Sequence, residues 1–240
     1  MADTERFVQS RVSGSGPLIL TVPHDGGLRL PGYAERDETT RWDGESRDVD
    51  VLPLARVLQD QLHARGIGSV LFWCTAHRSL VDVNREPDNQ PYADPRMLSV
   101  YNDFFVQLGL AVNQSLYQNH KAIVLDLHGF IRSPGPERYD VVIGSDSHRT
   151  TPRKLDLLLQ KHIHKEGLMC IQSPDLAKGV SARYRGGWIV RMSAPRWLGL
   201  VEACQIELAP HVRADPPNEY GQRVIAGIVG ALSEVLAGVV

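Results

Sequence analysis

The chain has 240 residues, of which 42% are hydrophobic, and its formal net charge is −2. This length suits one α/β domain or two small ones, and we expect a single domain (1–240) with one sizeable buried core. Positive and negative residues are mixed along the chain without a basic run that could neutralise a line of phosphates, so we expect no nucleic-acid partner.

The chain also lacks an apolar stretch long enough for a secretory signal or a membrane span. Its three cysteines, Cys74, Cys170 and Cys204, are far apart and form no CxxC pair. We therefore expect buried thiols, no disulfide framework, a cytoplasmic setting and no membrane partner. Residues 1–15 are polar and charged, and we expect them to form a loosely ordered N-terminal segment.

Short apolar runs alternate with longer amphipathic segments, which is a pattern typical of α/β proteins. In chain order, apolar runs and helical spacing predict a strand at 17–22, a helix at 48–65, a strand at 69–74, a helix at 101–117, strands at 122–127 and 139–143, a helix at 152–166, strands at 188–192 and 203–208, and a helix at 219–236. We expect a three-layer α/β/α fold in which a central mixed sheet is covered on both faces.

Two histidines directly follow predicted strands. His24 lies two residues beyond the first strand and precedes Gly26 and Gly27, while His128 follows the strand at 122–127 and precedes Gly129. Open α/β sheets bind ligands beyond the carboxyl ends of their strands. We therefore expect both imidazoles to converge on one crevice, where glycines let a ligand come close.

Two histidines and one carboxylate are a known ligand set for catalytic zinc, although they also suit iron or manganese. Asp48, near the start of the first long helix, is the best candidate for the carboxylate, with Asp50 as the alternative. An aspartate at Asp48 could instead cap the helix. Asp126 shares a strand face with His128 and could orient that imidazole, or it could cap a neighbouring loop.

Further candidates carry acid–base and binding chemistry. Glu207 lies on one side of the apolar segment CQIEL with Gln205. It either faces solvent or acts as a general base toward water at the metal. Arg85, Arg185 and Arg191 could each bind a carboxylate bidentately, or each could form a surface ion pair.

Taken together, these segments resemble the N-formylglutamate amidohydrolases. The resemblance is carried, in order, by LILTVPHDGG, LVDVNR, VLDLHG, and RYRGGWIVR followed by CQIEL, and it spans residues 17–210. It implies a zinc-peptidase-like (phosphorylase/hydrolase-like) α/β fold, related in architecture to carboxypeptidases and aspartoacylases. By role, it implies His24, Asp48 and His128 as zinc ligands, Asp126 behind them, Glu207 as the catalytic base, and Arg85, Arg191, Asn84 and Gly187 as substrate contacts.

The resemblance implies hydrolysis of the amide bond of a small N-acyl acidic amino acid, such as N-formylglutamate, with one divalent ion as cofactor. Two alternatives stay open: a related metallohydrolase that acts on a different amide or peptide, and a non-catalytic protein that binds a metal or another ligand. The chain departs from the family in the segment SPDLAKGVSARYRGG, which lacks the family's Asn-x-Pro-Tyr pattern. That segment is expected to touch the substrate.

Overall fold

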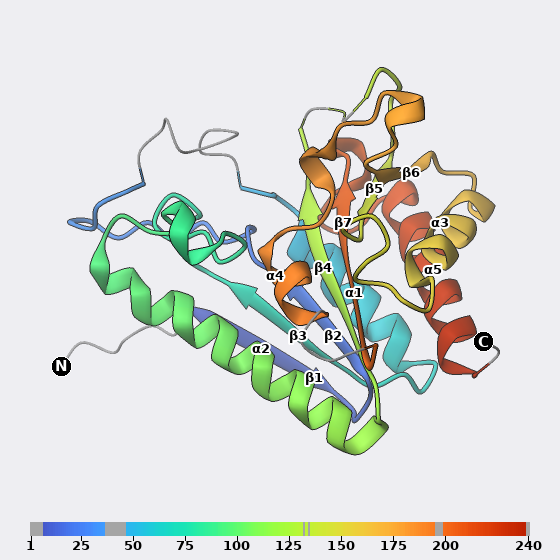
Figure 1. Cartoon of the computed structure of the whole chain (residues 1–240), viewed down its shortest axis with the longest axis horizontal. Coiled ribbons are helices and arrows are strands. Elements are labelled where there is room, and N and C mark those ends of the chain that lie inside the picture. The colour runs from blue at the N-terminus through green and yellow to red at the C-terminus, as the bar shows by residue number, and fades with distance from the viewer. Residues whose placement is uncertain (1–6, 37–46, 132, 134, 195–198, 239–240) are drawn as a thin grey trace.

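The computed structural model describes residues 7–36, 47–131, 133, 135–194 and 199–238. Over these residues the chain forms a seven-stranded sheet with helices on both faces (Figure 1). The strand order is β1-β3-β2-β4-β7-β5-β6. The predicted α/β class and its three-layer arrangement are therefore confirmed.

The sheet is mixed, as expected. Its strands are β1 (Val8–Ser13), β2 (Leu18–Val22), β3 (Ser69–Cys74), β4 (Ala122–Gly129), β5 (Val141–Gly144), β6 (Cys170–Ser173) and β7 (Val201–Leu208). Strands β3, β2, β4 and β7 run parallel, whereas β1 is antiparallel to β3 and β5 is antiparallel to β7. Because parallel strands end at the same edge of a sheet, the segments that follow β2, β4 and β7 meet there.

The helices divide between the two faces of the sheet (Figure 1). One face carries α1 (Val51–His63), α3 (Leu155–Lys165) and α5 (Glu219–Leu236), and the other carries α2 (Leu98–Asn119) and α4 (Trp188–Ser193). Short 3-10 turns lie in the connections: Pro87–Asn89, Pro95–Met97, Leu176–Lys178, Ala182–Tyr184 and Pro210–Val212. None of the helices in the described part of the chain combines the length and apolar composition that a bilayer crossing requires.

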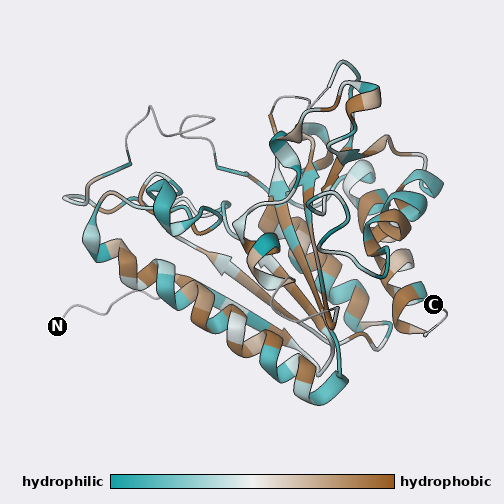
Figure 2. Ribbon diagram, in the orientation of Figure 1, coloured by the Kyte–Doolittle hydropathy of each residue, from teal (hydrophilic) through white to brown (hydrophobic). Residues whose placement is uncertain are grey.

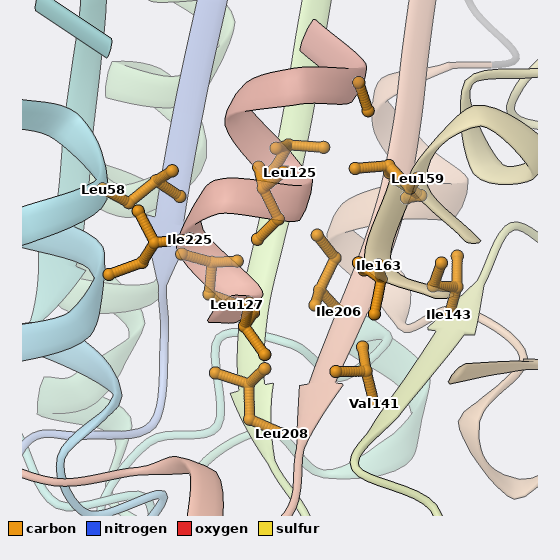
Figure 3. Close-up of a cluster of buried hydrophobic side chains, with 14 of the residues drawn as sticks. Leu58, Leu125, Leu127, Val141, Ile143, Leu159, Ile163, Ile206, Leu208 and Ile225 are labelled. Carbon is orange, nitrogen blue, oxygen red and sulfur yellow. The ribbon is translucent and has the colours of Figure 1, made fainter. Parts of the chain in front are cut away.

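Strands β4 and β7 separate apolar from polar side chains. Leu125, Leu127, Ile206 and Leu208 point into the core beneath α1, α3 and α5 (Figure 3). Figure 2 shows that these central strands are largely hydrophobic along their length. Because side chains alternate along a strand, the residues between these leucines and isoleucines point to the opposite face, where α4 packs. That alternation places the polar candidates of β4 and β7 together.

The predicted strand at 188–192 is wrong, because these residues form helix α4. Asn84 satisfies the first turn of this helix: its backbone carbonyl accepts from the N–H of Trp188 and its side-chain Oδ1 accepts from the N–H of Ile189, at 3.5 and 2.9 Å. These N–H groups have no partner inside a helix, so a distant asparagine stabilises the helix start. A short apolar run alone does not distinguish strand from helix.

Strands β1 and β6 were not predicted. Residues 1–15 were expected to be loosely ordered, but Val8–Ser13 pairs with β3 as an edge strand, and residues 1–6 lie outside the described part of the chain. Both strands are short or carry few apolar residues, which explains the missed signal. The three cysteines are free and buried, as expected.

Candidate metal centre and its cavity

Three predicted ligand residues from separate elements meet at the carboxyl edge of the sheet. His24 follows β2, Asp48 precedes α1 and His128 lies near the end of β4, and one ligand atom from each lies within 4.8 Å of the others. Asp48 Oδ2 is 3.1 Å from His128 Nδ1 and 3.5 Å from His24 Nδ1. All three side chains are buried. The structure thus brings together the residues that the sequence predicted as ligands.

The donor set fits a metal ion. His24 Nδ1 is buried and has no hydrogen-bond partner among the described residues. Leaving such an atom unsatisfied costs about 1–3 kcal/mol, and a cation beside it would remove that cost. Two imidazole nitrogens and a carboxylate oxygen are ligands that zinc accepts at catalytic sites.

The first turn of α1 shows which acidic residue binds the helix and which lies beside the histidines. The side chain of Asp25, rather than that of Asp48, binds the first turn of α1: its Oδ2 accepts the N–H of Leu52 at 2.8 Å. Asp50 is the N-cap residue, with a φ of 66°, and does not belong to the metal-binding group. Of the two carboxylates that the sequence left open, Asp48 is the one beside the histidines.

A second carboxylate lies behind each imidazole. His24 Nε2 is 2.7 Å from Asp82 Oδ1, and His128 Nε2 is 2.8 Å from Asp126 Oδ2. Asp126 also accepts a hydrogen bond from Thr21 Oγ1 at 2.6 Å. A carboxylate on the far nitrogen fixes the tautomer and the direction of a ligating ring. In both histidines this leaves Nδ1 as the atom that faces Asp48.

Asp82 had no role in the sequence prediction. It is buried, and its Oδ2 lies 3.3, 3.4 and 3.5 Å from guanidinium nitrogens of Arg36, Arg78 and Arg85. Burial alone would raise the pKa of Asp82, but His24 and the arginines outweigh it and hold the pKa well below its ordinary value. Its sequence signal was a lone aspartate between two valines in LVDVNR.

Glu207 faces the same group. It is the register partner of His128 in the β4–β7 pairing, and its Oε1 accepts a hydrogen bond from Gln205 Nε2. Glu207 is 4% exposed, so the solvent-facing alternative does not hold. Burial, opposed by the charge of His128, raises the pKa of Glu207 to about 7. A carboxyl group with a pKa near neutrality suits general acid–base catalysis.

The group opens into a cavity of about 730 Å³. This volume is within the range of pockets that hold small molecules. The lining includes five arginines: Arg78, Arg85, Arg183, Arg185 and Arg191. These five guanidinium groups outnumber the three carboxylates of the lining, Asp48, Asp82 and Glu207, so the cavity favours an acidic ligand. Arg78 and Arg183 were not among the predicted candidates.

Each of the four residues expected to contact a substrate lines this cavity: Arg85, Arg191, Asn84 and Gly187. Arg191 lies on α4 and not on a strand, and its Nη1 forms an ion pair with Glu86. A carboxylate ligand at Arg191 would therefore share that guanidinium with Glu86.

Asn84 and Gly187 are also packed against each other. Asn84 Nδ2 lies 3.0 Å from His128 Nε2, so this side chain joins the start of α4 to the metal-binding group. A Cβ atom on Gly187 would lie 2.2–2.5 Å from atoms of the Asn84 amide. Glycine is required here for the close approach of the two segments.

No protein-family model matches the chain, and no curated protein sequence matches it. Solved structures do match. A crystal structure of N-formylglutamate amidohydrolase from Ralstonia eutropha aligns with a TM-score of 0.71 at 19% identity, over 98% of this chain and 100% of that one. A gene product from Agrobacterium tumefaciens aligns with a TM-score of 0.68 at 18% identity, over 97% and 95%. The resemblance noted in the sequence is thus confirmed in the fold.

Proposed function

We propose that this protein is a zinc-dependent amidohydrolase that cleaves the amide bond of a small N-acyl acidic amino acid such as N-formylglutamate. The observation that carries the proposal is the His24–Asp48–His128 group, with Glu207 beside it, in an arginine-lined cavity. The fold shared with the Ralstonia eutropha N-formylglutamate amidohydrolase supports the same reaction class.

The candidate ligands support zinc because two imidazoles and a carboxylate leave a coordination position for water. When bound, zinc would supply a Lewis acid and lower the pKa of water from 15.7 to about 7. Asp82 and Asp126 hold the two imidazoles in place from behind. The free, buried cysteines support our expectation of a reducing, cytoplasmic setting.

Glu207 supplies the proton transfers of the proposed reaction. It accepts a proton from the attacking water as the new C–O bond forms. It then gives this proton to the amide nitrogen as the C–N bond breaks, which yields a carboxylic acid and an amine. The remaining acid proton passes to the amine, so the products leave as a carboxylate and an ammonium group. Glu207 is buried at the strand and lines the cavity, so it faces a ligand held there.

Arginines act on the charges of the substrate. Arg78 Nη1 is 3.7 Å from Asp48 Oδ1, so its guanidinium lies next to the reacting centre. There it stabilises the negative charge that develops on the amide oxygen. Arg85 and Arg191 orient the carboxylates of the amino-acid half, and Asn84 and Gly187 shape the cavity wall.

The test is metal analysis combined with a panel of N-acyl amino acids and short peptides. We expect one zinc ion per chain and turnover of N-acyl acidic amino acids that a chelator abolishes and zinc restores. Turnover of peptides alone would favour a related metallohydrolase. A metal-free protein that is inert on the whole panel would favour a non-catalytic binding protein and contradict the proposal.

A further inference from the structure

The arginines of the cavity come from two opposite flanks of the sheet. Arg78 and Arg85 belong to the connection that follows β3, whereas Arg183 and Arg185 belong to the connection that follows β6. In the sheet, β3 and β6 are separated by β2, β4, β7 and β5. The cavity therefore has a cationic wall on each side.

The reacting groups belong to the strands between these walls. His24 follows β2, His128 lies on β4 and Glu207 lies on β7. An amide held at this centre has one half directed to each flank. A formyl group as the acyl half would be small and uncharged, so it would not bind the wall that carries Arg183 and Arg185.

A backbone hydrogen bond and an ion pair hold the wall after β6. Asp146 holds Arg185 in two ways: its N–H donates to the Arg185 carbonyl at 2.6 Å, and its carboxylate lies 3.5 Å from Arg185 Nε. Asp146, Ser147 and His148 are three successive non-glycine residues with positive φ. Such a backbone persists only where its surroundings determine it, and it is common at functional sites.

A buried carboxylate fixes this left-handed turn. Asp156 is fully buried, and its Oδ2 binds both Ser145 Oγ and His148 Nδ1. The N–H of His148 also donates to Ser145 Oγ at 3.1 Å. These contacts from Asp156 to the turn, and from Asp146 to Arg185, therefore set the position of Arg185. The Arg185 side chain is 50% exposed and lines the cavity.

We infer that the substrate carries a negative charge on each side of the scissile amide, and that Arg185 binds the charge on the half that faces the wall after β6. This inference rests on the proposed amide hydrolysis and narrows its substrate class to amides in which both the amine half and the acyl half are acidic. N-formylglutamate, whose acyl half is neutral, should then be a poorer substrate than an amide with two acidic halves. The edge of a guanidinium that Asp146 does not engage can pair with a carboxylate bidentately.

A matched pair of substrates tests the inference. N-succinylglutamate and N-butanoylglutamate share the amine half and the acyl chain length, and differ in a terminal carboxylate against a methyl group. We expect the zinc-loaded protein to prefer the succinyl compound by about tenfold or more in kcat/KM, as a charge-assisted bidentate contact predicts. Arg185→Gln should reduce this ratio to near one. Arg185→Lys keeps the positive charge but cannot pair bidentately with a carboxylate, so it should give an intermediate ratio.

Arg149 offers a matched control. Its Nη1 lies 3.9 Å from Asp146 Oδ2 and its side chain is 80% exposed, but it does not line the cavity. Arg149→Gln should therefore leave the substrate ratio unchanged. An equal ratio in wild type and Arg185→Gln, or a wild-type preference for the butanoyl compound, would overturn the inference while leaving the amidohydrolase proposal standing.

Failure of the proposed function would look different. If the zinc-loaded protein hydrolyses neither compound, calorimetric binding of both to wild type and Arg185→Gln decides the inference. Tighter binding of the succinyl compound that Arg185→Gln removes would support a second anionic subsite. Equal binding of the two compounds by the wild type would overturn it.

Discussion

His128 and Glu207 are register partners on the adjacent parallel strands β4 and β7. Neighbouring strands lie about 4.8 Å apart, and residues in register point to the same face of a sheet. The candidate ligand and the candidate base are therefore set beside each other by backbone pairing, which loops do not disturb. The proposed chemistry depends on this rigid placement.

Glu207→Gln should retain zinc and lose turnover. The amide keeps the shape of the side chain but cannot accept the proton, so we expect kcat to fall by about 10²–10⁴-fold. Steady-state kinetics and metal content measure both effects. Glu202 is a matched control, because it is buried on the same strand but faces the opposite side, where it accepts the N–H of Arg153 at 3.0 Å. Glu202→Gln should leave kcat within about twofold of the wild-type value. A near-wild-type kcat for Glu207→Gln would show that another residue is the base.

Asp82→Asn should weaken zinc binding without removing a ligand. Asp82 Oδ1 orients His24 from its far nitrogen, and removal of such a partner lowers metal affinity by about 10–100-fold. Competition with a chelator of known affinity measures the change. Asp88 is exposed in the same connection, and Asp88→Asn should have no effect. Equal zinc affinity in Asp82→Asn and wild type would show that Asp82 does not hold His24 in its binding orientation.

Zinc affinity should rise with pH. Burial opposes the charged form of His128, but Asp126 and Asp48 outweigh it and raise the pKa of His128 well above its ordinary value. In the metal-free protein the doubly protonated form of this ring is therefore favoured, and zinc must displace the proton on Nδ1. We expect affinity to increase by about tenfold per pH unit for each proton released. Titration calorimetry in buffers of different ionisation enthalpy counts these protons, and a pH-independent affinity would contradict the expectation.

Gly187→Ala should impair the site through Asn84. The added Cβ would lie within 2.5 Å of the Asn84 amide, which contacts His128 and the start of α4. We expect a loss of about tenfold in kcat/KM and a lower Tm, because overpacking of this kind costs about 1–3 kcal/mol. Gly109 in α2 has nothing within 4 Å of a Cβ, so Gly109→Ala should raise Tm. Unchanged kinetics in Gly187→Ala would mean that Asn84 tolerates displacement.

Much of this architecture could be predicted from local patterns. Strand β3 was predicted with its observed bounds, Ser69–Cys74, because an apolar run between polar turns determines a buried strand. His24 and His128 were expected to converge because each stands at the carboxyl end of a strand in an open α/β sheet. Strand alternation correctly separated Glu207 from Ile206.

The missed features depend on contacts between distant segments. Asp82 contacts His24, 58 positions away in the sequence, and no local sequence pattern predicts that contact. Helix α4 begins where Asn84 satisfies its N–H groups, 105 positions before Ile189. Left-handed turns at non-glycine residues such as Asp146 also depend on their tertiary surroundings.

The central claim is that His24, Asp48 and His128 bind a single catalytic metal ion. Zinc titration of the metal-free protein, with wild type, His24→Ala, Asp48→Asn, His128→Ala and His63→Ala compared, tests it most directly. We predict one tight zinc site in wild type and in His63→Ala, whose imidazole lies at the exposed end of α1, and loss of that site in the other three variants. Retention of one tight zinc ion by all three ligand variants would contradict the account.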